Sequence, residues 1–416
     1  GPPCCHGADQ GRRRCELGAL SMRVRHYFDH AASSPMSSLC REEMARYDAQ
    51  EWAGANPNSL HTSGRAAFAA LERARTDVAR AVGAKRPSEV VFTSGGTEAN
   101  TLAIRGTALA QLQTPGSKRR RVLVSAVEHD SVLDPAASLE RDGFTVERIP
   151  VLSNGVVDLE AFEHMLGPDV ALVCVMGANN EVGAVQPIAR VVTLAHAQGA
   201  LVHCDAIQTF GHVPFNASQL GIDTASFAAH KVAGPVSCGA LYVRSRTPIV
   251  AQQVGGGQEG GLRSGTQDVR SAMAFAAVAK QAAAALQDND ALLRSHGRLI
   301  VDTLRAEGLD FFETLRREGI DTPETLPNIV HLLVPGHQTE GLVLGLDDLG
   351  YEVSGGSACS SGSLDPSHVL AAMGVPRDLA FCALRISFDA RVSAEECEGL
   401  AHALAQVCRE ASTRKR

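Results

Sequence analysis

The chain has 416 residues, of which 44% are hydrophobic and 20% are charged, and its formal net charge is −7. This length is compatible with one large domain and a smaller one, and the acidic balance argues against a nucleic-acid-binding protein, because phosphate backbones are bound by basic surfaces. No segment approaches the roughly 18–20 consecutive apolar residues of a membrane helix, and none near the start suits a secretion signal, so we predict a cytoplasmic protein without a membrane partner.

The first part of the chain carries no pattern of a packed element. We therefore expect residues 1–21 to be a disordered N-terminal extension ahead of Met22. The cysteines and the histidine of this extension lack the paired spacing of zinc ligands, so no metal site is predicted. The eleven cysteines of the whole chain are scattered and do not resemble the disulfide framework of a short secreted domain.

Helical and strand patterns alternate from residue 65 onward. A helix is predicted over 65–82, a buried strand over 89–93 and a helix over 97–112. Later strands are predicted at 122–125, 145–150, 170–176, 201–203 and 239–244, with helices near 132–141, 159–166 and 188–198. Such alternation indicates an α/β fold with a mostly parallel sheet covered by helices on both faces.

A second series of strand and helix patterns begins after a long alanine-rich helical region that follows Ser271. Its members lie at 328–334, 341–349, 366–373, 383–388 and 394–407. This series predicts a smaller α/β domain. We place the large domain at 40–285 and build the small domain from 22–39 together with 286–416.

A glycine-rich turn joins the strand at 89–93 to the helix that follows it. Its sequence is Thr-Ser-Gly-Gly-Thr-Glu, over residues 93–98. Glycines let the backbone approach an anion closely, and the free N–H groups at the start of a helix attract phosphate. Many such turns bind nothing, so this one alone is a weak indication of a phosphate site.

Two later segments also follow predicted strands. Asp205, in His-Cys-Asp-Ala-Ile-Gln (203–208), lies at a strand end, where it could pair with a protonated pyridine nitrogen or simply cap a helix. Lys231 follows a strand and precedes a Gly-Pro turn, which suits a Schiff-base lysine, although a surface lysine is the alternative. The order phosphate turn, Asp and Lys is much less expected by chance than any one of these pieces.

Cys359 lies in a run of small residues, Ser-Gly-Gly-Ser-Ala-Cys-Ser-Ser-Gly-Ser (354–363). A single cysteine is often a small buried hydrophobe. Here the loop has no apolar side chains with which to bury itself, so the thiol should be accessible and mobile. By contrast, Cys204, Cys238 and Cys382 lie in apolar contexts and are expected to serve packing.

As a set, these motifs identify the chain as a member of the class V aminotransferase family of fold-type-I pyridoxal-phosphate enzymes. Within that family it resembles the cysteine desulfurases of the NifS/IscS type, over nearly the whole chain. The resemblance implies a large domain with a mostly parallel, seven-stranded-type sheet that binds the cofactor, and a smaller C-terminal α/β domain that carries the cysteine loop. Further matching motifs are 28–32 (Phe-Asp-His-Ala-Ala), 56–57 (Asn-Pro), 128–129 (Glu-His), 179–183 (Asn-Asn-Glu-Val-Gly), 255–259 (Gly-Gly-Gly-Gln-Glu) and 263–266 (Arg-Ser-Gly-Thr).

The resemblance also implies roles around pyridoxal 5'-phosphate. Lys231 would bind the cofactor covalently, Asp205 would hold the pyridinium nitrogen and Gln208 would bond the ring hydroxyl. His129 would stack on the ring and move protons. Asn180 would contact the cofactor and, with Arg385, grip the substrate carboxylate, for which the planar fork of an arginine is suited. The residues implied at the phosphate are Gly96, Thr97, His230 and, reaching the phosphate of a partner subunit, Thr266, so a homodimer is expected.

The loop resembles the long catalytic loop of the NifS/IscS group. The implied reaction converts L-cysteine to L-alanine, because the thiolate of Cys359 attacks the substrate sulfur and keeps it as a persulfide. The sulfur would then pass to an acceptor protein, either an iron–sulfur scaffold or a thiolation enzyme. Two alternatives remain open: a selenocysteine lyase or other carbon–sulfur lyase, and an inactive scaffold protein of a sulfur pathway.

Four positions depart from the family pattern. Ala228 stands where a Ser or Thr usually helps to hold the phosphate, so one hydrogen bond to the cofactor is expected to be missing. Ser237 replaces a common Gly after the turn that follows Lys231. Gly260 stands where an Arg often follows the Gln-Glu pair, and Asp389 stands where a Gly often follows the strand of Arg385. None of them touches the expected chemistry directly.

Overall fold

The structure is a computed structural model that describes residues 24–356 and 365–414, with side chains as far as residue 411. The predicted N-terminal extension at 1–21 and the predicted nucleophile Cys359 lie outside the described residues.

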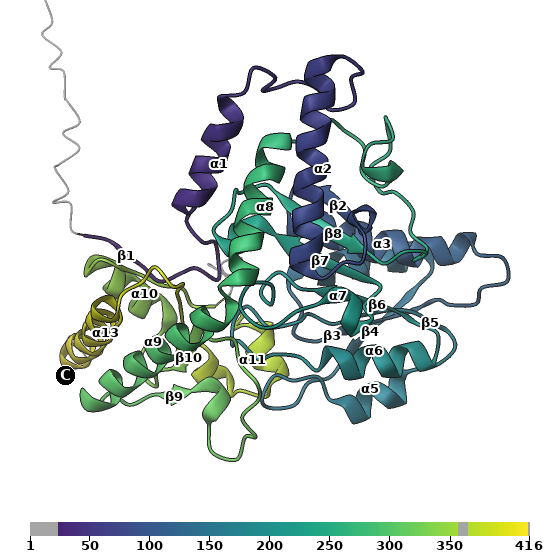
Figure 1. The fold of residues 1–416 in the computed structure, drawn as a ribbon. Helices are drawn as coiled ribbons and strands as arrows, with labels where there is room; N and C mark the ends of the chain where they lie inside the picture. Colours follow the sequence, from purple (N-terminus) through teal and green to yellow (C-terminus); the bar gives the residue numbers. More distant parts are fainter. Residues whose placement is uncertain (1–23, 357–364, 415–416) are drawn as a thin grey trace, which may run out of the picture.

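A seven-stranded sheet forms the centre of the larger half of the molecule (Figure 1). Its central strands consist largely of apolar residues that are buried on both faces, as parallel strands between two helical layers must be. The strand β8 pairs antiparallel with both of its neighbours, and the other pairs are parallel, which confirms the predicted mostly parallel α/β sheet. The strand order is β2 (Val90–Thr93), β8 (Gly239–Val243), β7 (Thr224–Ala228), β6 (Leu201–Asp205), β5 (Val170–Cys174), β3 (Arg121–Ser125) and β4 (Thr145–Ile149).

Helices cover both faces of this sheet. Side chains alternate between the two faces along each strand, so each face presents apolar side chains that a helical layer buries. Leu123 and Val173 belong to one apolar cluster, whereas Val122 and Leu172 belong to another on the opposite face. Five helices contribute side chains to the first cluster: α2 (Thr62–Val82), α5 (Leu159–Met165), α6 (Ile188–Ala197), α7 (Ala217–Leu220) and α8 (Val269–Ala284). The helix α1 (Ser38–Asp48) also contributes and packs beside α8. The second receives α3 (Gly96–Gln113) and α4 (Asp130–Ser138).

The smaller half is an α/β layer with its own apolar cluster, as predicted from the second series of patterns. Its antiparallel sheet has the order β12 (Ala383–Ser387), β10 (Ile329–Leu333) and β9 (Phe312–Glu313). The helices α9 (Leu286–Ala306), α10 (Thr339–Asp348) and α13 (Ala394–Arg414) pack with it, and α11 (His368–Ala372) and α12 (Arg377–Ala380) lie nearer the large sheet.

The first described residues lie against this smaller half (Figure 1). The short strand β1 (His26–Tyr27) pairs in parallel with β11 (Tyr351–Glu352), and the fully buried ring of Phe28 joins the apolar cluster of α9 and α13. Single 3-10 turns complete the described elements at Pro87–Glu89, Leu139–Asp142, Ala229–Val232, Glu259–Gly261 and Thr314–Arg316. Within the described ranges, none of the helices is both long enough and apolar enough to cross a membrane.

Candidate active site

A cavity of about 250 Å³ opens at the carboxyl ends of the parallel strands, where ligands of open α/β sheets bind. Segments from both halves of the molecule meet there. The predicted site residues that line it are Gly96, Thr97, His129, Asn180, Asp205, Gln208, His230, Lys231 and Arg385. The structure therefore brings together residues that are far apart in the sequence.

One end of the cavity has the features of an anion-binding site. The helix α3 begins at Gly96, and the first N–H groups of a helix have no partner within the helix. The preceding Gly95 has a φ of 152°, which favours glycine. A Cβ placed on Gly96 would lie 3.6 Å from the Cβ of Ala228 and still closer to the side chain of Ile207. Any residue larger than glycine at position 96 would therefore collide with Ile207, which lines the same cavity.

The carboxylate of Asp205 is almost fully buried at the end of β6. Its Oδ1 accepts a hydrogen bond from the N–H of Ile207 at 3.0 Å, and its Oδ2 accepts one from Nδ2 of Asn100 at 2.9 Å. Burial raises the pKa of Asp205 above its ordinary value, although these two hydrogen bonds oppose that shift. A cationic N–H group in the cavity would supply the charge that favours the ionised carboxylate.

The Nζ of Lys231 points at two backbone carbonyls of the cavity wall. It donates to the oxygen of Ala31 at 2.6 Å and to the oxygen of Ala32 at 2.7 Å. The side chain of Gln208 donates to the same carbonyl of Ala31 at 2.8 Å. Beside Lys231, burial and the nearby ammonium lower the pKa of His230 to about 4, so this imidazole is neutral at neutral pH.

The guanidinium of Arg385 enters the cavity from β12 and is buried. Its Nη1 donates to the carbonyl oxygen of Asn180 at 2.9 Å, and its Nη2 donates to Oδ1 of Asp29 at 2.8 Å. Its Nε has no hydrogen-bond partner in the part of the chain that the structure describes. A buried cation with an unused donor is suited to a carboxylate ligand.

His129 is fixed as the N-cap of α4. Its Nδ1 accepts a hydrogen bond from the N–H of Ser131 at 3.0 Å and lies 2.9 Å from the hydroxyl oxygen of the same residue. Since Nδ1 accepts from a backbone N–H, the ring proton of His129 is on Nε2.

Thr266 does not line the cavity. It lies on an exposed loop between Glu259–Gly261 and α8. Its predicted contact with the phosphate of a partner subunit therefore stays a prediction.

Three polar residues next to this site are absent from the sequence-based prediction. Asn100 and His203 are fully buried behind Asp205, and Ser131 lines the cavity beside His129. The available signal was a polar side chain at an otherwise apolar position, in the helix at 97–112 and in the strand that ends at Asp205. Such positions are satisfied by partners distant in sequence, which a single sequence does not reveal.

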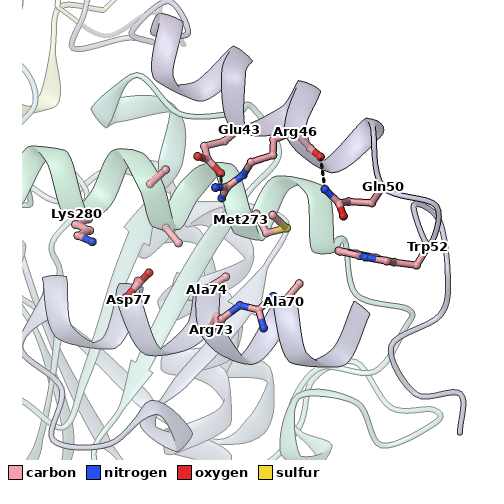
Figure 2. A pocket seen from close by; sticks show the side chains of 12 residues that line it. Glu43, Arg46, Gln50, Trp52, Ala70, Arg73, Ala74, Asp77, Met273 and Lys280 are labelled. Carbon is pink, nitrogen blue, oxygen red and sulfur yellow. Dashed lines mark hydrogen bonds and ion pairs between the residues drawn. The ribbon is translucent and has the colours of Figure 1, made fainter. Parts of the chain in front are cut away.

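A larger cavity, of about 540 Å³, lies between α1, α2 and α8 (Figure 2). Its walls include the small side chains of Ala70 and Ala74, and the charged groups of Glu43 and Arg46 pair with each other. None of the predicted site residues that the structure describes lines it. The larger cavity therefore has no predicted site residue of the described chain in common with the smaller one.

Comparisons with known proteins agree on one family. The sequence pattern described as Aminotransferase class-V matches residues 26–400. The IscS-like cysteine desulfurase of Mycobacterium tuberculosis is 41% identical over 364 residues, which cover 87% of this chain and 90% of the relative. The solved structure of a NifS-like protein superimposes with a TM-score of 0.83 at 34% identity, covering 93% of this chain and 100% of the other. The structure of SspA in complex with cysteine gives a TM-score of 0.73 at 30% identity and covers 87% of this chain and 98% of the other.

Proposed function

Since the chain belongs to the class V aminotransferase family, we propose that it is a pyridoxal-phosphate-dependent cysteine desulfurase, which converts L-cysteine to L-alanine and transfers the sulfur to Cys359. The observation that carries this proposal is the convergence of Asp205, Lys231 and Arg385 on one cavity. A buried acid, an amine and a buried guanidinium suit, respectively, a pyridine ring, an aldehyde and an amino-acid carboxylate.

The residues present fit pyridoxal phosphate. The start of α3 at Gly96 and Thr97 would hold the phosphate, Asp205 the ring nitrogen and Gln208 the ring hydroxyl. His129 would lie against the ring, and Lys231 would hold the cofactor covalently, with His230 beside the phosphate. When bound, the cofactor supplies an electron sink for the bonds at the α-carbon of an amino acid.

The chain's own residues divide the work. Arg385 and Asn180 hold the substrate carboxylate, which fixes the α-carbon relative to Lys231. The Nζ of Lys231, once it leaves the carbonyls of Ala31 and Ala32, removes the α-proton of the substrate. Asp205 would hold the ring nitrogen of the bound cofactor, and a negative charge on its carboxylate would favour the withdrawal of electrons from the substrate.

Sulfur transfer is assigned to the thiolate of Cys359. A new S–S bond forms as the C–S bond of the substrate breaks, and the electron pair of that bond stays on the carbon skeleton, which takes up one proton at the β-carbon and regains the α-proton from Lys231 to become alanine. Cys359 follows Gly356, which lines the cavity, by three residues, and three residues of chain span at most about 11 Å. Ser367 follows Cys359 in the sequence, and its hydroxyl donates to Oε2 of Glu181 at 2.5 Å. Gly356, which precedes Cys359, lies beside the same carboxylate.

The proposal extends to partners. The persulfide would be delivered to an acceptor protein, either an iron–sulfur scaffold or a thiolation enzyme. The enzyme would act in the cytoplasm as a homodimer in which the exposed Thr266 reaches the phosphate site of the other subunit. The large domain at 40–285 would hold the cofactor, and the small domain would carry the cysteine loop.

The test is the stoichiometry of the reaction. The protein loaded with pyridoxal phosphate and given L-cysteine and a thiol reductant should form alanine and sulfide in equal amounts. Turnover of L-selenocysteine alone would indicate a selenocysteine lyase instead. A protein that neither acquires the cofactor's absorbance nor forms alanine would indicate an inactive scaffold.

A further inference from the structure

A chain of buried hydrogen bonds lies behind the cavity and links four segments of the protein. Its centre is the side-chain amide of Asn100, on the second turn of α3. The amide nitrogen donates to Oδ2 of Asp205 and to the hydroxyl oxygen of Ser131, each at 2.9 Å. The amide oxygen faces Nε2 of His203, also at 2.9 Å. All the hydrogen-bonding groups of this amide are therefore engaged.

The chemistry of Asp205 sets the direction of every bond in this chain. An ionised carboxylate only accepts, so Asn100 must turn its nitrogen toward Asp205 and its oxygen toward His203. The Nε2 of His203 must then carry a proton. Burial lowers the pKa of His203 to about 3, so this ring is neutral and its Nδ1 accepts from the hydroxyl of Thr224 at 2.9 Å.

The hydroxyl of Ser131 links the amide of Asn100 to the ring of His129. The hydroxyl oxygen of Ser131 accepts from Asn100, so its own proton is free to be donated to Nδ1 of His129. The backbone N–H of Ser131 donates to the same nitrogen at 3.0 Å. Two donors thus face Nδ1 of His129, and its ring proton is on Nε2.

We propose that Asn100 is a positioning residue that joins Asp205 and His129 into one hydrogen-bonded unit. This inference rests on the proposed function and deepens it. Through Asn100 the carboxylate of Asp205 is held as an acceptor toward the cofactor ring, and His129 is held with its proton on Nε2. His129 then acts on the cofactor and substrate as a donor, because it cannot take a proton on Nδ1 without breaking the bonds from Ser131.

The first arm of the test needs no cofactor. The full-length protein, with histidines labelled with nitrogen-15, is examined by two-bond proton–nitrogen NMR, and signals are assigned with the variants His129→Gln and His203→Gln. In both His129 and His203, Nε2 should carry the ring proton and Nδ1 should be unprotonated. A proton on Nδ1 of either ring would overturn the proposal, because that nitrogen could no longer accept from Ser131 or Thr224.

The second arm uses the variant Asn100→Asp, which keeps the shape of the side chain but sets a carboxylate against Asp205. Two carboxylates in contact cannot both be ionised, so they share a proton and the ring nitrogen loses part of its counter-charge. The affinity for pyridoxal phosphate labelled with nitrogen-15 in its ring should fall about tenfold or more, and the ring signal should shift toward the unprotonated form. Asn100→Ser, which lacks the amide but adds no charge, should show a smaller change in the same direction.

The matched control is Thr107→Ala, which removes a buried hydroxyl from the same helix that bonds only backbone carbonyls. It should leave both the affinity and the ring signal unchanged. Asn100→Asp with wild-type affinity and a wild-type ring signal would overturn the positioning role. If the wild-type protein itself fails to bind the cofactor, the proposed function fails, whereas the first arm still decides the hydrogen-bond pattern.

Discussion

Arg385 and Asp29 form an ion pair at 2.8 Å across 356 positions of sequence. The pair joins the first described segment of the chain to the last strand of the small sheet at the wall of the cavity. Because a second donor of Arg385 is engaged by the carbonyl of Asn180, the plane of the guanidinium is fixed before any substrate arrives. A fixed guanidinium loses little conformational entropy when it binds a carboxylate.

The substitution Arg385→Lys tests this arrangement. A lysine keeps the positive charge but cannot hold Asp29, Asn180 and a carboxylate in one plane. The KM for L-cysteine should rise roughly 10- to 100-fold, as expected for the loss of a charge-assisted hydrogen bond, with a smaller change in kcat. An unchanged KM would show that the substrate carboxylate binds elsewhere.

Lys231→Ala tests the covalent attachment of the cofactor. The variant should lose all turnover, and borohydride should no longer fix the cofactor to the protein. In the wild type, borohydride reduction followed by peptide mapping should place the label on Lys231. Lys280→Ala, at an exposed lysine of the other cavity, should behave like the wild type. A label on any other lysine would refute the assignment.

The predicted weakness at the phosphate end can be tested with a pair of variants of nearly equal shape. Ala228 lines the cavity next to Gly96, where a hydroxyl would be within reach of a phosphate. Ala228→Thr should bind pyridoxal phosphate several-fold more tightly, because one neutral hydrogen bond contributes about 1 kcal/mol. Ala228→Val adds similar bulk without the hydroxyl and should bring no gain. Equal affinities of the two variants would contradict the missing hydrogen bond.

Buried histidines give the protein a predictable pH dependence of stability. Burial lowers the pKa of His203 to about 3, of His331 to about 3 and of His212 to about 4, whereas unfolded histidine titrates near pH 6.5. Below about pH 6.5 the unfolded chain binds protons that the folded protein does not, so the free energy of unfolding falls as the pH drops toward 4. Each histidine contributes up to about 1.4 kcal/mol per pH unit.

Urea unfolding of the cofactor-free protein between about pH 7 and about pH 5 measures this effect. The midpoint should fall steadily with pH, and the variant His164→Gln, at an exposed histidine, should keep the same slope. A midpoint that stays constant over this range would contradict the buried neutral histidines.

The sequence predicted the sheet well, because its strands are short apolar runs buried on both faces. The strand predicted at 170–176 is β5 at Val170–Cys174, and the helix predicted at 188–198 is α6 at Ile188–Ala197. The helix α1 was not predicted, since Cys40 and Tyr47 are its only buried residues and its position depends on packing against α8. The domain boundary near residue 285 stays a prediction.

The residues that line the cavity were predictable where they belong to a compact motif and not where they bond to distant partners. Asp205 and Lys231, which were singled out from their neighbours in the chain, both line the cavity, and their roles stay predictions. Asn100 was missed because its partners Ser131 and Asp205 lie 31 and 105 positions away. Likewise, the sequence around Arg75 in its amphipathic helix does not indicate that this residue makes a buried ion pair with Glu259, 184 positions away.

If Cys359 receives the sulfur, the persulfide can be located on it. The enzyme loaded with pyridoxal phosphate is given a limiting amount of L-cysteine, alkylated at once and mapped by mass spectrometry. The extra sulfur should be found on Cys359 in the wild type and in Cys382→Ser, which alters a buried cysteine 23 positions away in the sequence. In Cys359→Ser it should be absent and alanine formation should collapse, while the spectral change on adding cysteine survives, because a serine hydroxyl cannot accept sulfur. Extra sulfur on another cysteine, or alanine released from Cys359→Ser at the wild-type rate, would contradict the account and leave a simple lyase in its place.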